Sequence, residues 1–201
     1  MKQNYVVGFQ NITGVSYAGK SGKHDATAPA IVTSNGAGPH NVQLFFLSPD
    51  GVVLHCLLGY WAPNDLLVEM RFVQNYQWKL WNSSLSMDEK KKRFRQNNLL
   101  AARTLPTDLV GRSHLQSFDA KHEMKKPQSD FVFRPGDFHP PQPKGMKSGN
   151  LKSTVQVIHE RMAKRPFVPY DEFDIEAFSD YGRERYDKKE ETRVATPAKK
   201  R

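Results

Sequence analysis

The sequence predicts an α/β fold that is organised around two antiparallel strands and the helix that follows them. Residues 42–47 and 52–58 are two runs of almost continuous apolar side chains, a pattern that is typical of strands buried on both faces. The turn sequence Ser-Pro-Asp-Gly at 48–51 joins them, and so short a turn makes the two strands antiparallel neighbours. A helix is then expected from residue 65 to about residue 81, with Asn64 as its N-cap.

The predicted helix over 65–81 has an apolar face and a polar face. The apolar face is expected to pack on the sheet and carries Leu66, Met70, Val73 and Leu80. The polar face carries Glu69, Arg71, Gln74 and Lys79. The pattern therefore places these four polar side chains on the side away from the core.

The residues before the central unit predict one more strand and a long loop. Residues 4–12 are rich in β-branched and aromatic side chains, which favours a strand. Residues 13–39 are mostly small and polar, and we expect a surface loop there. Gly36-Ala37-Gly38 begins like a dinucleotide fingerprint, but the third glycine is replaced by Asn41 and the segment precedes a strand. We therefore expect a flexible turn here.

Capping residues mark two helices in the middle of the chain. Ser86 and Glu89 have the spacing of a capping box, which predicts a helix over 87–103. Thr107 is expected to cap a third helix that runs from 108 to about 125. The apolar content of the helix over 87–103 is thin, and the third helix carries Leu109, Leu115 and Phe118 as apolar residues.

The composition divides the chain into five parts. The predicted parts are a partial α/β domain over 1–82, a helical region over 83–126, an extended linker rich in Pro and Gly over 127–150, a C-terminal helical extension over 151–185, and a disordered charged tail over 186–201.

Two short helices are expected within the C-terminal extension. Ser153 is the expected N-cap of a helix over 154–164, which must end before Pro166. Asp174 is the expected cap of a last short helix.

The net charge and the composition limit the classes of partner that the chain could bind. The 201 residues carry a net charge of +9 and are only 38% hydrophobic. A positive charge permits binding to nucleic acid, anionic membranes or acidic proteins, but it is first of all a property of the solvated surface. The sequence holds no apolar stretch long enough for a membrane span and no secretory h-region after Lys2. We therefore expect a cytoplasmic protein, or an exported one if the native chain starts upstream of Met1.

The segment from Leu44 to Met70, LFFLSPDGVVLHCLLGYWAPNDLLVEM, resembles bacterial thioredoxin-like proteins. In that family a turn containing Asp-Gly joins the third and fourth strands of the sheet. The resemblance covers about residues 1–81, and the segment 151–188 is similar to a C-terminal extension found on such proteins. It implies a three-layer thioredoxin-like domain that is incomplete at its N-terminus.

The redox site of that family is not carried over to this chain. Thioredoxin chemistry needs a Cys-x-x-Cys pair at the start of a helix, and Cys56 is the only cysteine. The family's cis-proline would fall on Asn41 or Val42, whereas Pro39 is out of register. We therefore expect neither catalytic residues nor a cofactor, and we expect Cys56 to be a buried and inert core residue.

No local pattern among the histidines predicts a metal site. The chain contains neither H-x-x-x-H nor C-x-x-C. The histidines are therefore expected to be surface or capping residues. They are His24, His40, His55, His114, His122, His139 and His159.

Two surface features remain as candidate binding sites. A basic cluster within the helix 88–103 consists of Lys90, Lys91, Lys92, Arg93 and Arg95. It could neutralise nucleic-acid phosphates without reading sequence, but we favour a solvated helix face. An aromatic group around the helix 65–81 could form a peptide-binding surface, although core packing is the commoner role of such residues. It consists of Tyr60, Trp61, Tyr76, Trp78 and Trp81.

These observations favour a non-catalytic thioredoxin-like protein that serves as a scaffold for an unidentified protein partner. One alternative is a truncated thiol–disulfide oxidoreductase whose active-site half is missing. The other is a basic nucleic-acid-associated protein that uses the helix 88–103, although we expect no specific nucleic-acid recognition.

Overall fold

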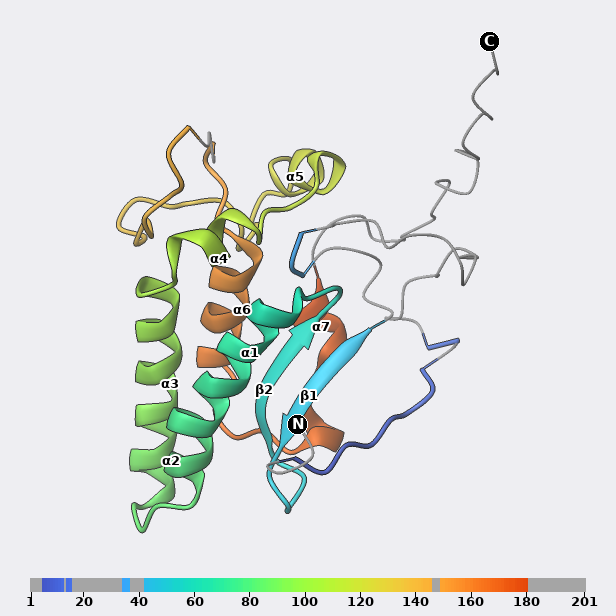
Figure 1. The fold of residues 1–201 in the computed structure, drawn as a ribbon, viewed down its shortest axis with the longest axis vertical. Helices are drawn as coiled ribbons and strands as arrows, with labels where there is room; N and C mark the ends of the chain where they lie inside the picture. Colours follow the sequence, from blue (N-terminus) through green and yellow to red (C-terminus); the bar gives the residue numbers. More distant parts are fainter. Residues whose placement is uncertain (1–4, 13, 16–33, 37–41, 146–148, 181–201) are drawn as a thin grey trace.

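The computed structural model describes residues 5–12, 14–15, 34–36, 42–145 and 149–180, and these residues form a mixed helix and strand structure (Figure 1). The tail predicted from residue 186 lies outside them. In chain order the elements are β1 (Gln43–Leu47), β2 (Val53–Leu58), α1 (Pro63–Phe72), the π-helical turn η1 (Val73–Trp78), α2 (Lys79–Trp81), α3 (Met87–Arg103), α4 (Thr107–Gly111), α5 (Ser117–Glu123), α6 (Thr154–Ala163), the 3-10 turn η2 (Tyr170–Glu172) and α7 (Ile175–Ser179).

The predicted antiparallel strand pair is present as β1 and β2. Phe45 pairs with Cys56, and Phe46 pairs with His55. Gly51 closes the turn with φ +77°, a left-handed conformation that favours glycine. Every residue of β2 is buried, whereas β1 is half-buried and exposed at its end. The expectation of strands buried on both faces is therefore confirmed for β2 and wrong for β1.

The two faces of β1 contact different parts of the chain. The ring of Phe45 packs edge-on against Tyr170 and Phe173, with ring centroids 4.9 and 5.7 Å apart. The ring of Phe46 lies near His55 and Tyr5 on the other side. In Figure 1 the helices α1, α3 and α6 lie on one side of the strand pair, and the C-terminal segment with α7 passes behind it.

The strand predicted over 4–12 is wrong for its described part. Residues 5–12 contain no strand, and the side chains of Val6 and Phe9 are fully exposed. Their segment touches the rest of the described structure through side chains, because Tyr5 donates to the carbonyl oxygen of Met70 and Gln10 accepts from Tyr170. Strand-forming side chains need a partner strand to pair with, and no described strand pairs with this segment.

The helix predicted over 65–81 is confirmed, with an earlier start and a π-helical turn in its middle. Pro63 is its first residue and Ala62 its N-cap, so the prediction of Asn64 as the cap is wrong. Proline suits this first position because its missing N–H would have no helical partner there. The predicted apolar face is buried or half-buried, but Glu69 is buried too. Its assignment to the outer, polar face is therefore wrong.

The helix α6 forms the centre of the helical part. Ser153 caps it as predicted, by accepting from the backbone N–H of Gln156 at 3.3 Å. All of its residues except Glu160 are buried, and α3 packs along it (Figure 1). The predicted cap of α3 is also present, since Ser86 accepts from the N–H of Glu89 at 3.3 Å.

The single helix predicted over 108–125 is wrong, because the chain forms two short helices, α4 and α5. Between them, backbone groups bind other segments instead of continuing the helix. The carbonyl oxygen of Arg112 accepts from Asn35, and that of Ser113 accepts from Thr154 at the start of α6. The cap predicted at Thr107 is likewise wrong, because Thr107 is the first helical residue and Pro106 occupies the N-cap.

The segment predicted as an extended linker contributes a core residue. Phe131 is fully buried, and its carbonyl oxygen accepts from the N–H of Lys152 at 2.7 Å. The neighbouring Val132 forms an isolated bridge with Leu151. Residues on both sides of the proline-rich stretch are therefore tied together just before α6.

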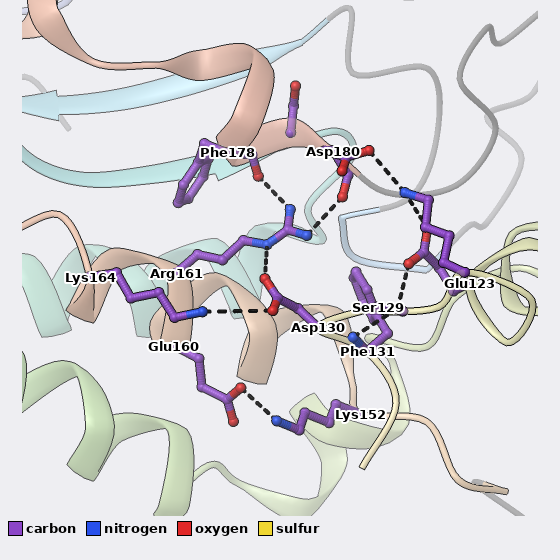
Figure 2. Close-up of polar contacts among 12 residues, drawn as sticks. Glu123, Ser129, Asp130, Phe131, Lys152, Glu160, Arg161, Lys164, Phe178 and Asp180 are labelled. Atoms are coloured by element: carbon purple, nitrogen blue, oxygen red, sulfur yellow. Dashed lines mark hydrogen bonds and ion pairs between the residues drawn. The ribbon is translucent and has the colours of Figure 1, made fainter. Parts of the chain in front are cut away.

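Arg161 on α6 fastens the end of the described chain. Its guanidinium donates to the carbonyl oxygens of Phe178 at 2.6 Å and Asp180 at 2.7 Å, and to the carboxylate of Asp130 at 3.1 Å (Figure 2). The helix α7 begins as predicted, with Asp174 accepting from the N–H of Ala177. Among the described helices, none is both long enough and apolar enough to cross a bilayer.

Candidate functional site

Three ionisable side chains from three elements meet in the core. His55 lies on β2, Glu69 on α1 and His159 on α6, and each is at most 1% exposed. The Nε2 atom of His55 lies 3.0 Å from Oε2 of Glu69, and Nε2 of His159 lies 3.3 Å from the same oxygen. We call these three residues the His–Glu–His cluster.

A hydrogen bond from His159 to Asn98 fixes the orientation of the His159 ring. The side-chain amide of Asn98 donates to the carbonyl oxygen of Phe94 at 3.0 Å, so its Oδ1 is the atom that faces Nδ1 of His159 at 3.1 Å. Because Oδ1 only accepts, Nδ1 of His159 carries the proton. In a neutral ring the lone pair of Nε2 then points at the Glu69 carboxylate, so a proton or another cation must lie between them.

His55 has no such second partner. Its Nδ1 atom is buried and has no hydrogen-bond partner among the residues that the structure describes. The ring stacks on that of His159, with centroids 5.2 Å apart and planes inclined by 24°, and Phe72 packs edge-on against both imidazoles. These ring contacts hold both imidazoles beside Glu69, and the 3.0 Å contact with the carboxylate favours a proton on Nε2 of His55.

The electrostatics of the cluster favour an ionised Glu69. Burial acts to raise the pKa of this carboxyl, but the charges and hydrogen bonds of His159 and His55 outweigh it and hold the pKa far below its usual range. Burial lowers the pKa of His55, against the opposing effect of Glu69. A buried carboxylate without a counter-charge is very costly, so a compensating positive charge belongs between Glu69 and the two imidazoles.

A pocket of about 290 Å³ reaches the cluster from the surface. Glu69 and His159 contribute to its lining. Most of the rest of its wall is apolar and comes from Val68, Phe72, Tyr76, Leu100, Ala101, Leu105 and Pro106. Four polar residues complete the lining, namely Arg71, Asn75, Asn97 and Thr104. The pocket thus lies between α1–η1 and the C-terminal half of α3, with ionisable groups among its lining.

A second charged cluster lies around the start and the end of α6 (Figure 2). Lys152 pairs with Glu160 at 2.8 Å and with Asp137 at 2.9 Å. Lys126 pairs with Glu123 at 3.1 Å and with Asp180 at 2.9 Å. In these pairs each lysine charge is balanced by carboxylates of the chain itself. The cluster is therefore best explained as structural, because it holds the chain after α5 in place.

The predicted basic cluster lies on the outer side of α3. Lys91, Lys92, Arg93 and Arg95 are exposed, and Phe94 between them is fully buried. Lys90 donates to the carbonyl oxygen of Trp81 at 2.7 Å and lies over its ring, while Arg93 pairs with Glu89 one turn away. The structure does not bring these cations to the pocket.

The remaining candidates from the sequence separate into core and surface residues. Cys56 is fully buried, as predicted, and burial raises the pKa of its thiol well above the usual value. In the aromatic group Trp61 is buried and donates to the carbonyl oxygen of Leu58. Tyr76 is 52% exposed and is the member of the group that lines the pocket.

The glycine segment at 36–38 is described only at Gly36. Its N–H donates to the carbonyl oxygen of Tyr60 at 2.8 Å, and a side chain at this position would collide with Thr154. Gly36 thus serves close packing at the start of α6. Residues 37 and 38 lie outside the described part of the chain.

Sequence reasoning missed the His–Glu–His cluster because its members are distant along the chain and belong to no local pattern. Two signals were present. His55 interrupts the apolar run of β2, and His159 directly follows the apolar residue Ile158 on α6. A histidine inside an otherwise apolar segment needs a buried partner, and the partner here is Glu69. Its charge led to its assignment to the polar face, although its spacing of three residues from Leu66 and four from Val73 places it on the apolar face.

Comparison with known proteins gives no relative from which a function could be transferred. No protein-family model matches the chain, and no curated protein or solved structure matches it significantly.

Proposed function

We propose that this chain is a non-catalytic binding protein whose ligand is a small molecule held in the pocket between α1–η1 and α3. The single observation that supports this function is the composition of the pocket. Mostly apolar walls, a few polar groups and a buried carboxyl with a lowered pKa, here Glu69, are the usual properties of a ligand site. Its volume of about 290 Å³ suits a small ligand.

The position of the polar residues supports a ligand with one polar end. Glu69 and His159 are buried, whereas Arg71 and Asn75 are exposed. The rings of Phe72 and Tyr76 are neighbours tilted by 32°, with centroids 5.7 Å apart, and offer an aromatic wall. A ligand that places an apolar body against this wall and a polar group beside His159 would use both the aromatic and the buried polar part of the lining.

A blocking substitution tests this function. Ala101 lines the pocket, so Ala101→Trp fills it, whereas Leu99→Trp puts the same side chain on an exposed position of α3 outside the lining. We expect fragments that bind the wild type in a ligand-observed NMR screen to bind Leu99→Trp equally and to lose binding to Ala101→Trp. Equal binding to both variants would place the ligand site elsewhere.

A protein-interaction scaffold of thioredoxin-like descent is the second candidate. It is supported by the antiparallel strand pair followed by α1, and by apolar side chains exposed near the pocket. Tyr76 is 52% exposed and Leu100 is 57% exposed, and exposed aromatic and aliphatic groups are typical of the anchors of protein interfaces. Trp78 in the aromatic group is also exposed but lies outside the pocket lining. Loss of a captured partner on Trp78→Ser, with fragment binding unchanged, would favour this candidate.

A further inference from the structure

We propose that His55, Glu69 and His159 bind one divalent transition-metal ion, with Zn²⁺ as the ion that the donor set fits best. This site does not depend on the small-molecule ligand proposed above. The inference rests on the identity of the donors, on their spacing, and on the hydrogen bond that Asn98 makes with His159.

The donor set is that of known zinc sites. Two imidazole nitrogens and one carboxylate oxygen are the protein ligands of many catalytic zinc ions, which keep a further position open. The same set also suits Fe²⁺. Mg²⁺ and Ca²⁺ prefer oxygen ligands, so two nitrogens out of three donors select against them.

The spacing of the donors suits a common ion. Bonds of about 2.0–2.2 Å at tetrahedral angles place donor atoms about 3.4 Å apart. In the structure the two Nε2 atoms lie 3.0 and 3.3 Å from Oε2 of Glu69. One donor atom from each of the three residues lies within 4.8 Å of the other two. Small side-chain shifts would therefore admit an ion.

The surroundings of His159 match those of a metal ligand. Metal-bound histidines almost always donate their second N–H to a nearby oxygen, which fixes the tautomer. Asn98 accepts this proton from Nδ1 at 3.1 Å, which leaves the lone pair of Nε2 pointing at Glu69. A metal ion between Nε2 and the carboxylate would supply the positive charge that this buried oxygen requires.

His55 can adopt the tautomer that the site needs. Nε2 of His55 contacts Glu69 at 3.0 Å, and an ion that takes the place of the proton between them would move that proton to Nδ1, which has no partner in the described part of the chain. The open position of the ion would face the pocket, because Glu69 and His159 belong to its lining whereas His55 does not. A small anionic or neutral donor in the pocket could then complete the coordination.

Titration of metal-free full-length protein tests the proposal. We expect isothermal titration calorimetry to show one equivalent of Zn²⁺ bound with a Kd of about 1 μM or tighter, and no binding of Mg²⁺. Glu69→Gln and His159→Ala should weaken binding at least 100-fold, and Asn98→Ala about 10- to 100-fold through loss of orientation. His122→Ala on α5, which removes a histidine outside the cluster, should bind as the wild type does.

A spectroscopic readout on the wild type keeps the test independent of variant folding. Co²⁺ at one equivalent should give the intense visible absorption of a low-coordinate site, and added Zn²⁺ should abolish it. Failure of the wild type to bind either ion would overturn the proposal in favour of an imidazolium–carboxylate cluster. Full binding by correctly folded Glu69→Gln and His159→Ala, judged by circular dichroism, would also overturn it.

Discussion

Asp65 and Glu69 lie one turn apart on α1, and both carboxylates are directed into the protein. Asp65 is 2% exposed and Glu69 is 1% exposed. Glu69 contacts His55 and His159, whereas Asp65 accepts two hydrogen bonds from Arg112, at 2.7 and 2.8 Å. A single face of α1 therefore connects β2, α6 and the segment after α4.

The Asp65–Arg112 pair is expected to contribute to stability. Asp65→Asn removes the charge and leaves the amide of Asn35, which donates to Asp65 at 2.7 Å, with a poorer acceptor. We expect a loss of about 1–3 kcal/mol in the free energy of unfolding at pH 7, the usual cost of weakening a buried charge-assisted bond. Urea unfolding measures this loss. The exposed Asp50→Asn serves as the control and should be nearly neutral.

The contribution of Asp65 should depend on pH in a defined direction. Hydrogen bonds from the Arg112 guanidinium lower the pKa of Asp65 despite its burial. A carboxyl whose pKa is lower in the folded than in the unfolded protein contributes its full stabilisation at pH values above the unfolded-state pKa of about 3.9. This stabilisation is lost as the pH falls through the folded-state pKa. The difference between wild type and Asp65→Asn should thus be constant from pH 8 to 6 and shrink below pH 4. A difference that stays the same at pH 3 would contradict this assignment.

Arg161 should be irreplaceable by lysine. Its guanidinium reaches three acceptors, on Asp130, Phe178 and Asp180, and one ammonium group cannot reproduce this geometry. We expect Arg161→Lys to lower the free energy of unfolding by about 2–3 kcal/mol and to speed amide exchange in α7 more than in α3.

The control for this substitution is Lys164→Ala. Lys164 is 64% exposed and lies 3.6 Å from Asp130, so its loss should change stability by less than about 1 kcal/mol. Equal effects of Arg161→Lys and Lys164→Ala would show that the fastening of α7 does not depend on the three bonds.

Phe131 should behave as a core residue although it lies in a proline-rich segment. It is fully buried, whereas Phe138 in the same segment is 42% exposed. Phe131→Ala is expected to cost about 3–5 kcal/mol, the usual cost of removing a buried aromatic ring. Phe138→Ala should cost less than about 1 kcal/mol. Thermal unfolding of both variants measures these losses in stability. Similar small losses for Phe131→Ala and Phe138→Ala would mean that the segment is not packed on the core.

The thiol of Cys56 should react only in the unfolded chain. It is fully buried, and burial raises its pKa, so both access and thiolate formation are suppressed. A thiol reagent at pH 8 should label the native protein at the rate of global unfolding and label the denatured protein at once. Rapid labelling of the native protein would contradict the assignment of Cys56 to the core.

The features that could be predicted from the sequence are those that neighbouring residues determine. The turn at 48–51 and the caps at Ser86, Ser153 and Asp174 depend on contacts within four residues, and the structure confirms them. The predicted helix over 108–125 failed because backbone groups near Ser113 bind a segment that lies some 40 residues away in the chain.

The candidate site could not be predicted for the same reason. The charge of Glu69 favours exposure to solvent, and only the contacts with His55 and His159, which come from distant segments, offset the cost of burying it. The pocket likewise depends on how α1–η1 and α3 are placed together, which no pattern within either helix specifies. The thioredoxin-like resemblance remains a prediction about descent.

NMR of the histidine ring nitrogens tests the proposed metal site of the His–Glu–His cluster most directly. Protein labelled with ¹⁵N-histidine should show, in long-range ¹H–¹⁵N NMR spectra, that His159 carries its proton on Nδ1. One equivalent of Zn²⁺ should then shift the Nε2 signals of His55 and His159 together and leave those of His114, His122 and His139 unchanged. Zinc-dependent shifts confined to these other histidines, or no shift at all, would contradict the metal site in the core.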